Sequence, residues 1–448
     1  MYHLESKVLQ KMYHLERFKN MKDYPKNMKK EELDFVLFEQ QKDFEEEEPL
    51  VERELTKKAL ELINLKLPII VTGVRRCGKS SLLKIIKNKL SLKNKEYLYI
   101  NFNDERFIGF STENFQIITD FIVEQKYKEK CFLFLDEIQE VSGWEKWIDR
   151  IKSKYPIFIT GSNSRLLSKE ISTILTGRSL SIGLTPFNFT EFLLSKNFNL
   201  KDWKIDKQKQ ISILTEFKEY FEIGGFPKRI LSGQNIILKE LYDQIIYRDI
   251  INRFPKSNAK SIKEISVYLL SNPSSLISVR NMSKITGVKN LLTAKAIIDS
   301  FENAFLFFFI NKFDYSVKKQ TQNPRKAYCV DNGFIASLGF RMSDDKGKLL
   351  ENLVAIELKR REKEIFYYSD KNECDFLIRE NNKITQAIQV CYDVNEQNKE
   401  REFKGLVDAM NKFDLKEGII LTYTQQEELD FEGKKIKMIP VWKWLLIK

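Results

Sequence analysis

The sequence predicts an α/β fold that begins with a parallel sheet covered by helices. Short, continuously apolar runs alternate with segments of helical spacing, as expected of strands buried on both faces of such a sheet. The runs are residues 67–73, 97–102, 131–137 and 157–162. The first run leads directly into a glycine-bearing turn and a helix, an order typical of loops that bind phosphate.

The chain of 448 residues is longer than one ordinary core requires, so we expect several domains. A charged lead-in that we interpret as solvated precedes the α/β core, and a mainly helical lid or linker follows it. Three short amphipathic helices and two strands come next, the winged-helix arrangement. A second α/β domain ends the chain. The predicted bounds of the five segments are 1–48, 49–192, 193–260, 261–331 and 332–448.

Composition narrows the classes of protein that remain. Lys and Arg (75) outnumber Asp and Glu (63), which suits a nucleic acid or an anionic surface but also arises from ordinary solvated faces. Five scattered cysteines without a C-x-x-C pair indicate reduced thiols rather than a disulfide frame or a zinc site. The most apolar segment, residues 303–310, is far shorter than the ~20 residues that span a bilayer. We therefore expect a cytoplasmic protein without a membrane partner.

Residues 73–80 match the phosphate-loop pattern G-x-x-x-x-G-K-[ST] in full. Such a loop turns backbone N–H groups toward the phosphates of ATP, and the following helix adds its positive end. We expect Lys79 to reach the β- and γ-phosphates and Ser80 to ligate Mg²⁺. The predicted ATP-binding residues are Gly73, Val74, Arg75, Arg76, Cys77, Gly78, Lys79, Ser80 and Ser81.

An acidic pair follows the third apolar run. Asp136 and Glu137 come at the carboxyl end of a predicted parallel strand, where ligands of such sheets bind. Asp136 fits the carboxylate that holds Mg²⁺, and Glu137 fits the base that orients the attacking water. The same dipeptide is also common as a helix cap, so the prediction depends on the phosphate loop upstream.

Further polar residues complete the predicted catalytic set. Asn163, with Ser162 beside it, follows the fourth apolar run and would sense the γ-phosphate. Arg178 and Arg229 could neutralise charge in the transition state, although a surface salt bridge is the alternative for each. Arg75 and Arg76 would face either the nucleotide or a partner.

These residues resemble the AAA-type ATPases of a broad archaeal and bacterial family of uncharacterised ATP-binding proteins. The resemblance is carried by "GVRRCGKSSLL", "FLDEIQEVSGWEKWI", "PFNFTEFL" and "GGFPKRI". In the second half, "LLENLVAIEL" and "YYSDKNECDFLI" resemble the domain of unknown function that follows the ATPase in that family. The resemblance covers the chain from about residue 50 onward.

The tail is similar in pattern to the restriction-endonuclease-like fold. Nucleases of this fold place a helix glutamate, a strand aspartate and an E-x-K pair around Mg²⁺. Glu351 and Asp375 match the first two positions, whereas the E-x-K position contains Gln389, Val390 and Cys391. The resemblance thus implies a nuclease-like scaffold with a degenerate site that does not cut. Weak metal binding and a purely structural role both remain open for the two acids.

Three functions follow from these patterns. The first is an ATPase whose cycle changes how the C-terminal half engages DNA or a protein partner, with Lys284, Lys289 and Lys295 near the candidate recognition helix. The others are an ATP-dependent nuclease and a slowly hydrolysing signalling or assembly scaffold. An arginine supplied in trans would require a homo-oligomer.

Overall fold

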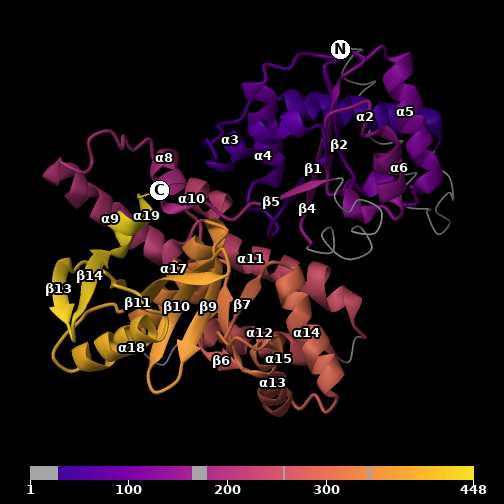
Figure 1. Cartoon of the computed structure of the whole chain (residues 1–448). Helices are drawn as coiled ribbons and strands as arrows, with labels where there is room; N and C mark the ends of the chain where they lie inside the picture. The colour runs from indigo at the N-terminus through magenta and orange to yellow at the C-terminus, as the bar shows by residue number, and fades with distance from the viewer. Residues whose placement is uncertain (1–28, 164–178, 256–257, 341–344, 448) are drawn as a thin grey trace.

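The computed structural model describes residues 29–163, 179–255, 258–340 and 345–447. Figure 1 shows the N-terminal α/β part lying beside the C-terminal sheet, with helices from the middle of the chain between them. The segment between residues 164 and 178, which includes the predicted Arg178, lies outside the described residues.

The first sheet is parallel and five-stranded. Its order is β2-β3-β4-β1-β5, so β4 separates the strand before the phosphate loop from the strand that carries Asp136. Nearly every residue of β1, β3 and β4 is buried, which is why these strands read as continuous apolar runs. The strands are β1 (Ile69–Thr72), β2 (Tyr97–Asn101), β3 (Phe132–Asp136), β4 (Ile157–Gly161) and β5 (Leu180–Gly183).

Helices cover both faces of this sheet, and one of them departs from the prediction. Part of the charged lead-in is not solvated: α2 buries Leu33, Leu37 and Phe44 and lies along β2, an edge strand. The Gln41 side chain accepts a hydrogen bond from the Tyr99 N–H at 3.1 Å, so α2 satisfies an edge that would otherwise be open. The helices are α2 (Lys30–Glu45), α3 (Leu55–Leu62), α4 (Lys79–Lys89), α5 (Phe115–Glu124) and α6 (Trp144–Ile151).

The predicted lid or linker is mainly helical in its described residues. A π-helical turn, Ile245–Ile250, extends α11 directly and is followed by a 3-10 turn, Ile251–Arg253. Pro at the first position of α10 favours the start of that helix, because its missing N–H would have no partner there. The helices are α8 (Phe189–Ser195), α9 (Lys207–Ile223), α10 (Pro227–Ser232) and α11 (Ile236–Gln244).

Three helices and a small antiparallel sheet follow, close to the expected segment. The sheet has the order β6-β8-β7, with a short strand β6 and a helix α15 that the sequence analysis did not predict. The elements are α12 (Ala259–Ser271), β6 (Leu276–Ile277), α13 (Val279–Thr286), α14 (Leu291–Asn303), β7 (Phe307–Asn311), α15 (Val317–Gln322) and β8 (Arg325–Cys329).

The C-terminal part contains a six-stranded mixed sheet of order β13-β14-β12-β11-β10-β9. Strands β9, β10 and β11 are antiparallel neighbours, whereas β11 pairs with β12 in parallel after the crossover through α18. The elements are α16 (Asn332–Leu338), α17 (Lys346–Arg360), β9 (Glu364–Ser369), β10 (Glu373–Glu380), β11 (Lys383–Val390), α18 (Lys399–Lys412), β12 (Glu417–Thr422), β13 (Glu427–Phe431), β14 (Lys434–Pro440) and α19 (Val441–Leu445).

The described residues also bear on two expectations from composition. All five cysteines are free and buried, so none is in a disulfide. Among the helices that the structure describes, none combines the length and the apolar content needed to cross a bilayer.

Candidate nucleotide site

The strand order of the first sheet places the predicted residues at one edge. The phosphate loop follows β1, Asp136 ends β3, and Ser162 follows β4 between them. Because the strands are parallel, their carboxyl ends meet at the same edge of the sheet, where α/β proteins bind ligands.

The phosphate loop closes on the start of α4. Gly78, the residue before the helix, has a φ of 103°, a left-handed conformation that glycine adopts without strain. Lys79 is only 4% exposed, and its Nζ donates to the carbonyl oxygens of Gly73 and Val74 at 3.2 and 3.3 Å. Its ammonium group therefore lies inside the curve of the loop, where a phosphate would bind.

Two oxygen-bearing side chains that could ligate Mg²⁺, Ser80 and Asp136, lie together where the sequence predicted a magnesium site. The Ser80 hydroxyl donates to Asp136 Oδ2 at 2.5 Å, and the Tyr99 hydroxyl donates to the same oxygen at 2.9 Å. Asp136 also accepts a hydrogen bond from Thr160. A hydroxyl and a carboxylate in contact suit Mg²⁺, which prefers hard oxygen ligands and keeps several waters. The residues present thus fit the ion.

Glu137 has a left-handed backbone conformation with φ of 52°, which is costly for a residue with a long side chain. The surrounding groups hold it there: its N–H donates to Thr160 Oγ1 at 3.0 Å, and Ser162 donates to Glu137 Oε2 from its hydroxyl at 2.9 Å. Glu137 Oε1 lies 3.3 Å from Lys79 Nζ. The carboxylate is therefore aimed at the lysine inside the loop.

The two neighbouring acids titrate in opposite directions. Burial, together with the charge of Glu137, raises the pKa of Asp136. Burial acts the same way on Glu137, but the charge of Lys79, together with the charge of Arg75 and hydrogen bonds from Gln139 and Ser162, lowers the pKa of Glu137 overall. The pKa of Lys79 is raised, since Glu137 and Asp136 favour its charged form against the cost of burial. A lysine and a glutamate that are both ionised thus face each other at the loop.

A cavity of about 810 Å³ opens in front of these residues. Its walls come from the phosphate loop and the acidic pair on one side and from the helical segment on the other, the latter through Pro227, Lys228 and Arg248. Arg229, which the sequence suggested as a candidate, is buried in α10 and does not line this cavity. Lys228 and Arg248 are instead the cations that the helical segment presents.

An arginine of the loop itself contacts the helical segment. Arg75 donates to Asp249 from Nε at 3.0 Å and from a terminal nitrogen at 2.8 Å, a bidentate pair. Asp249 lies in the π-helical turn after α11. Arg75 is therefore paired with another part of the chain, whereas Arg76 is exposed, and both arginines line the cavity.

Arg53, which precedes the first sheet, contacts the phosphate loop on the side away from the cavity. It is 4% exposed and donates to the carbonyl oxygens of Cys77 at 2.9 Å and Thr185 at 2.7 Å. Its Nε lies 3.0 Å from Glu191 Oε1 on α8. Arg53 could not be predicted as part of the site from the sequence, because a single arginine in a highly charged stretch carries no pattern.

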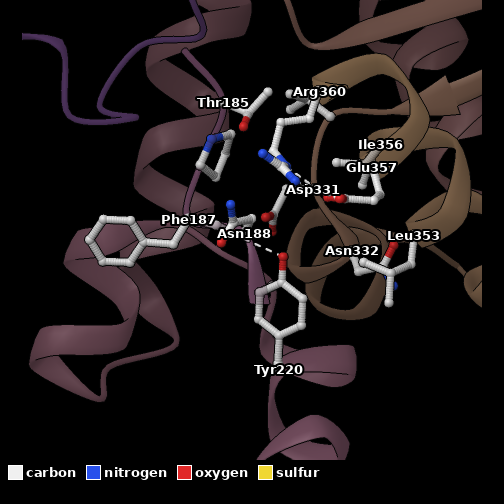
Figure 2. A pocket seen from close by; sticks show the side chains of 13 residues that line it. Thr185, Phe187, Asn188, Tyr220, Asp331, Asn332, Leu353, Ile356, Glu357 and Arg360 are labelled. Carbon is white, nitrogen blue, oxygen red and sulfur yellow. Dashed lines mark hydrogen bonds and ion pairs between the residues drawn. The ribbon is translucent and has the colours of Figure 1, made fainter. Parts of the chain in front are cut away.

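The same region connects the sheet to the C-terminal part. Glu54 accepts a hydrogen bond from Arg360 of α17 at 2.8 Å, and Arg360 is paired with Glu357 (Figure 2). Asp331 accepts from the N–H groups of Gly225 and Gly333 at 2.7 and 2.9 Å. The region surrounds a cavity of about 10 Å³, roughly the space of one water.

The "GGFP" motif is explained by this junction. A Cβ at Gly225 would lie 2.1 Å from the carbonyl oxygen of Phe187, so only glycine allows the two segments to approach. The Gly225 carbonyl accepts from the Phe187 N–H at 2.7 Å, and the Tyr220 hydroxyl donates to the Phe187 carbonyl at 2.9 Å (Figure 2). The motif thus serves packing between segments, and Pro227 after it reaches the nucleotide cavity.

The remaining predicted residues divide into two groups. Ser81 lines the cavity, and Asn163 is buried at the end of β4. Val74 and Cys77 point into the core instead, so only their backbone would face a phosphate. The Cys77 thiol lies 3.4 Å from the Leu184 carbonyl oxygen, and burial raises its pKa.

Comparison with known proteins shows the family of the chain. Three family models match the chain: an AAA domain over residues 66–193, and two domains of unknown function over residues 214–346 and 346–444. An uncharacterized protein of Methanocaldococcus jannaschii is 38% identical over 88% of this chain and 93% of its own length. One of Haemophilus influenzae is 30% identical over 84% and 94%. The chain belongs to an AAA-type ATPase family of uncharacterised proteins.

One solved structure similar to this family member is the Walker-type ATPase of Pyrococcus abyssi. It is 16% identical, and the alignment covers 64% of this chain and 96% of that one with a TM-score of 0.35.

The C-terminal part of this ATPase-family chain brings the other predicted residues together. Glu351 on α17, Asp375 on β10 and Gln389 on β11 all line a cavity of about 870 Å³. The Asp375 N–H donates to Gln389 Oε1 at 3.2 Å, and Gln389 donates in turn to Glu402 of α18 at 2.7 Å.

The structure adds a residue that the sequence analysis did not name. Lys326 comes from β8, outside the C-terminal sheet, and is 3% exposed. Its Nζ lies 3.0 Å from Glu351 Oε1, 2.9 Å from Asp375 Oδ1 and 2.7 Å from Glu373 Oε1. The Glu351 side chain also accepts from the Tyr328 hydroxyl at 2.7 Å.

Proposed function

We propose that the protein is a Mg²⁺-dependent ATPase in which ATP binding and hydrolysis change how the C-terminal half engages a partner. The observation that carries this proposal is the shared wall of the nucleotide cavity, which the phosphate loop and the helical segment build together. A nucleotide in this cavity would contact both parts, so its loss would alter the relation between them.

Each residue of the site has a specific task in this proposal. The loop N–H groups and Lys79 would bind the phosphates, and Ser80 with Asp136 would hold Mg²⁺, which neutralises phosphate charge when bound. The phosphates would compete with Glu137 for Lys79 and so release the carboxylate. Glu137, still oriented by Ser162, would then accept a proton from the attacking water.

Two connections would pass the nucleotide state to the rest of the chain. The Arg75–Asp249 pair links the loop to the helical segment. Arg53 contacts the loop at the Cys77 carbonyl, and its neighbour Glu54 contacts Arg360 on α17. Asn163 would sense the γ-phosphate from β4, and Arg178 is the proposed arginine finger, in cis or from a second copy.

DNA is the first candidate partner. The three helices and the small sheet have the order of a winged helix, a fold that often places one helix in the major groove. Lys284, Lys289 and Lys295 are all exposed on or beside α13 and α14. Leu292 is also 77% exposed there, which favours a protein partner as the alternative.

Turnover tests the ATPase directly. Glu137→Gln should lower ATP hydrolysis by roughly 10²–10⁴-fold while ATP still binds, because only the base is lost. Glu145→Gln, on the neighbouring helix α6, should hydrolyse ATP like the wild type. Equal and negligible turnover in wild type and Glu137→Gln would instead favour the slowly hydrolysing scaffold.

The partner is tested by measuring the binding of duplex DNA at low and high salt, and the ATPase rate with and without that DNA. DNA affinity that weakens with salt and is lost when the three lysines are changed to alanine would support DNA as the partner. Absence of DNA binding at low salt would favour the protein partner instead.

Mass in solution with and without ATP tests whether a second copy of the chain takes part. DNA that stays intact with Mg²⁺ or Mn²⁺ would exclude the nuclease.

A further inference from the structure

Lys326 and the acids around it form a cluster in the C-terminal part that the ATPase function does not use. The cluster consists of Lys326, Tyr328, Glu351, Glu373 and Asp375. Lys326 and Tyr328 come from β8, whereas the acids come from α17 and β10, so the cluster joins the small sheet to the C-terminal sheet.

The cluster has the acids of a metal site, but a lysine ammonium lies between them. A nuclease-like fold implies Mg²⁺ between Glu351 and Asp375. Here the Lys326 ammonium contacts one oxygen of each, at 3.0 and 2.9 Å. The second Asp375 oxygen accepts the Val390 N–H at 3.0 Å. The residues therefore do not fit Mg²⁺.

The charge of the cluster supports the same conclusion. A buried carboxylate requires a cation or strong hydrogen bonds, because its desolvation is costly. Lys326 supplies its positive charge to the two buried acids, Glu351 and Asp375, within 3.0 Å, whereas Glu373 is 43% exposed to water. The Tyr328 hydroxyl and the Val390 N–H donate the further hydrogen bonds that the two buried acids accept. Gln389, where a nuclease would have a second acid, is neutral and bonded to Glu402, so it adds no negative charge that a divalent ion would be needed to balance.

We infer that the Lys326 ammonium is the built-in cation of this centre, taking the place that a divalent metal ion holds in a nuclease-like site. The centre then needs no metal to be stable. It holds β8 against α17 and β10 through one side chain, and within the described residues Mg²⁺ then belongs to the nucleotide site.

Mn²⁺ binding to the full-length chain, measured by EPR without nucleotide, tests the inference. The wild type should bind no Mn²⁺ that depends on Glu351 or Asp375, so Glu351→Gln and Asp375→Asn should leave its binding unchanged. Lys326→Met, which removes the ammonium at similar length, should gain a Mn²⁺ site. Adding Glu351→Gln to Lys326→Met should weaken that site at least tenfold.

The control is Lys318→Met, an exposed lysine on α15, which should behave like the wild type. Mn²⁺ bound by the wild type and lost in Glu351→Gln would overturn the inference. So would a Lys326→Met variant that is folded by circular dichroism and gains no Mn²⁺. If Lys326→Met does not fold, the wild-type comparison with Glu351→Gln and Asp375→Asn still decides.

Discussion

Two buried lysines of this chain, Lys79 and Lys326, differ in how their charge is balanced. Lys79 has one carboxylate at 3.3 Å and two loop carbonyls at 3.2 and 3.3 Å. Lys326 has three carboxylates between 2.7 and 3.0 Å. Lys79 is thus loosely held beside an open cavity, whereas Lys326 is fully paired.

This difference in charge balance indicates what each lysine is suited to bind. Charge-assisted hydrogen bonds are strongest when short, so a phosphate can replace the long contacts of Lys79 at little cost. Replacing three short contacts of Lys326 would leave buried acids unpaired. For Lys326 the fold itself supplies the partners, whereas for Lys79 we expect a ligand to supply them.

The largest expected effect is on ATP turnover when Lys79, the lysine beside the open cavity, is changed. Lys79→Ala should lower ATP turnover by roughly 1,000-fold and weaken ATP binding, because a positive charge aimed at the β- and γ-phosphates is lost. Hydrolysis assays and a fluorescent ATP analogue measure both. Lys89→Ala, at the exposed end of the same helix, is the control. Unchanged nucleotide affinity in Lys79→Ala would contradict the expectation that Lys79, unlike Lys326, binds a ligand.

The paired lysine should instead govern stability. Lys326→Met should lower the free energy of unfolding by about 3–5 kcal/mol, since it leaves buried carboxylates without their cation. Denaturant titration in metal-free buffer measures the loss, and Lys318→Met should cost almost nothing. A loss no greater than that of the control would mean that the acids do not need Lys326.

Arg75 extends the comparison to a cation with a single dedicated acid. Because Arg75 and Asp249 form a bidentate, largely buried pair, a double-mutant cycle with Arg75→Gln and Asp249→Asn should give a coupling free energy of about 1–2 kcal/mol. Denaturant unfolding of the four proteins measures it. Additive effects of the two changes would show that the loop and the helical segment are independent.

Asp331 is the opposite case, a buried acid whose hydrogen bonds come from backbone N–H groups. Burial raises its pKa to about 7, although these hydrogen bonds act to lower it. The folded chain therefore holds a proton that the unfolded chain loses above the ordinary pKa, so this contribution to stability is present at low pH and disappears as pH rises through about 7.

Asp331→Asn should remove that dependence. Between pH 5 and pH 8 the wild type should lose about 2.5 kcal/mol more than the variant in the free energy of unfolding. Denaturant titrations at the two pH values measure the difference. Parallel stability profiles would show that Asp331 titrates normally.

Much of the nucleotide site was accessible to sequence reasoning, because its residues lie in short motifs next to apolar strands. Lys79, Ser80, Asp136 and Glu137 meet as the loop and strand patterns predicted. Tyr99 and Thr160 were missed, since a hydroxyl inside an apolar strand gives no signal until the neighbouring strands are known.

The C-terminal cluster shows where such reasoning ends. Glu351 and Asp375 follow recognisable patterns, but Lys326 lies 25 and 49 residues before them on another sheet. Lys326 contacts these acids because β8 packs on α17, and no local sequence pattern predicts that packing. The buried face of α2 was hidden for a related reason, because its apolar residues are diluted by charge.

The number of Mn²⁺ ions bound per chain, counted by EPR with a saturating non-hydrolysable ATP analogue, tests the contrast between the two lysines most directly. We predict a single ion that disappears when the analogue is omitted or Asp136 is changed to Asn. A second ion that remains without the analogue and is lost in Asp375→Asn would contradict the account.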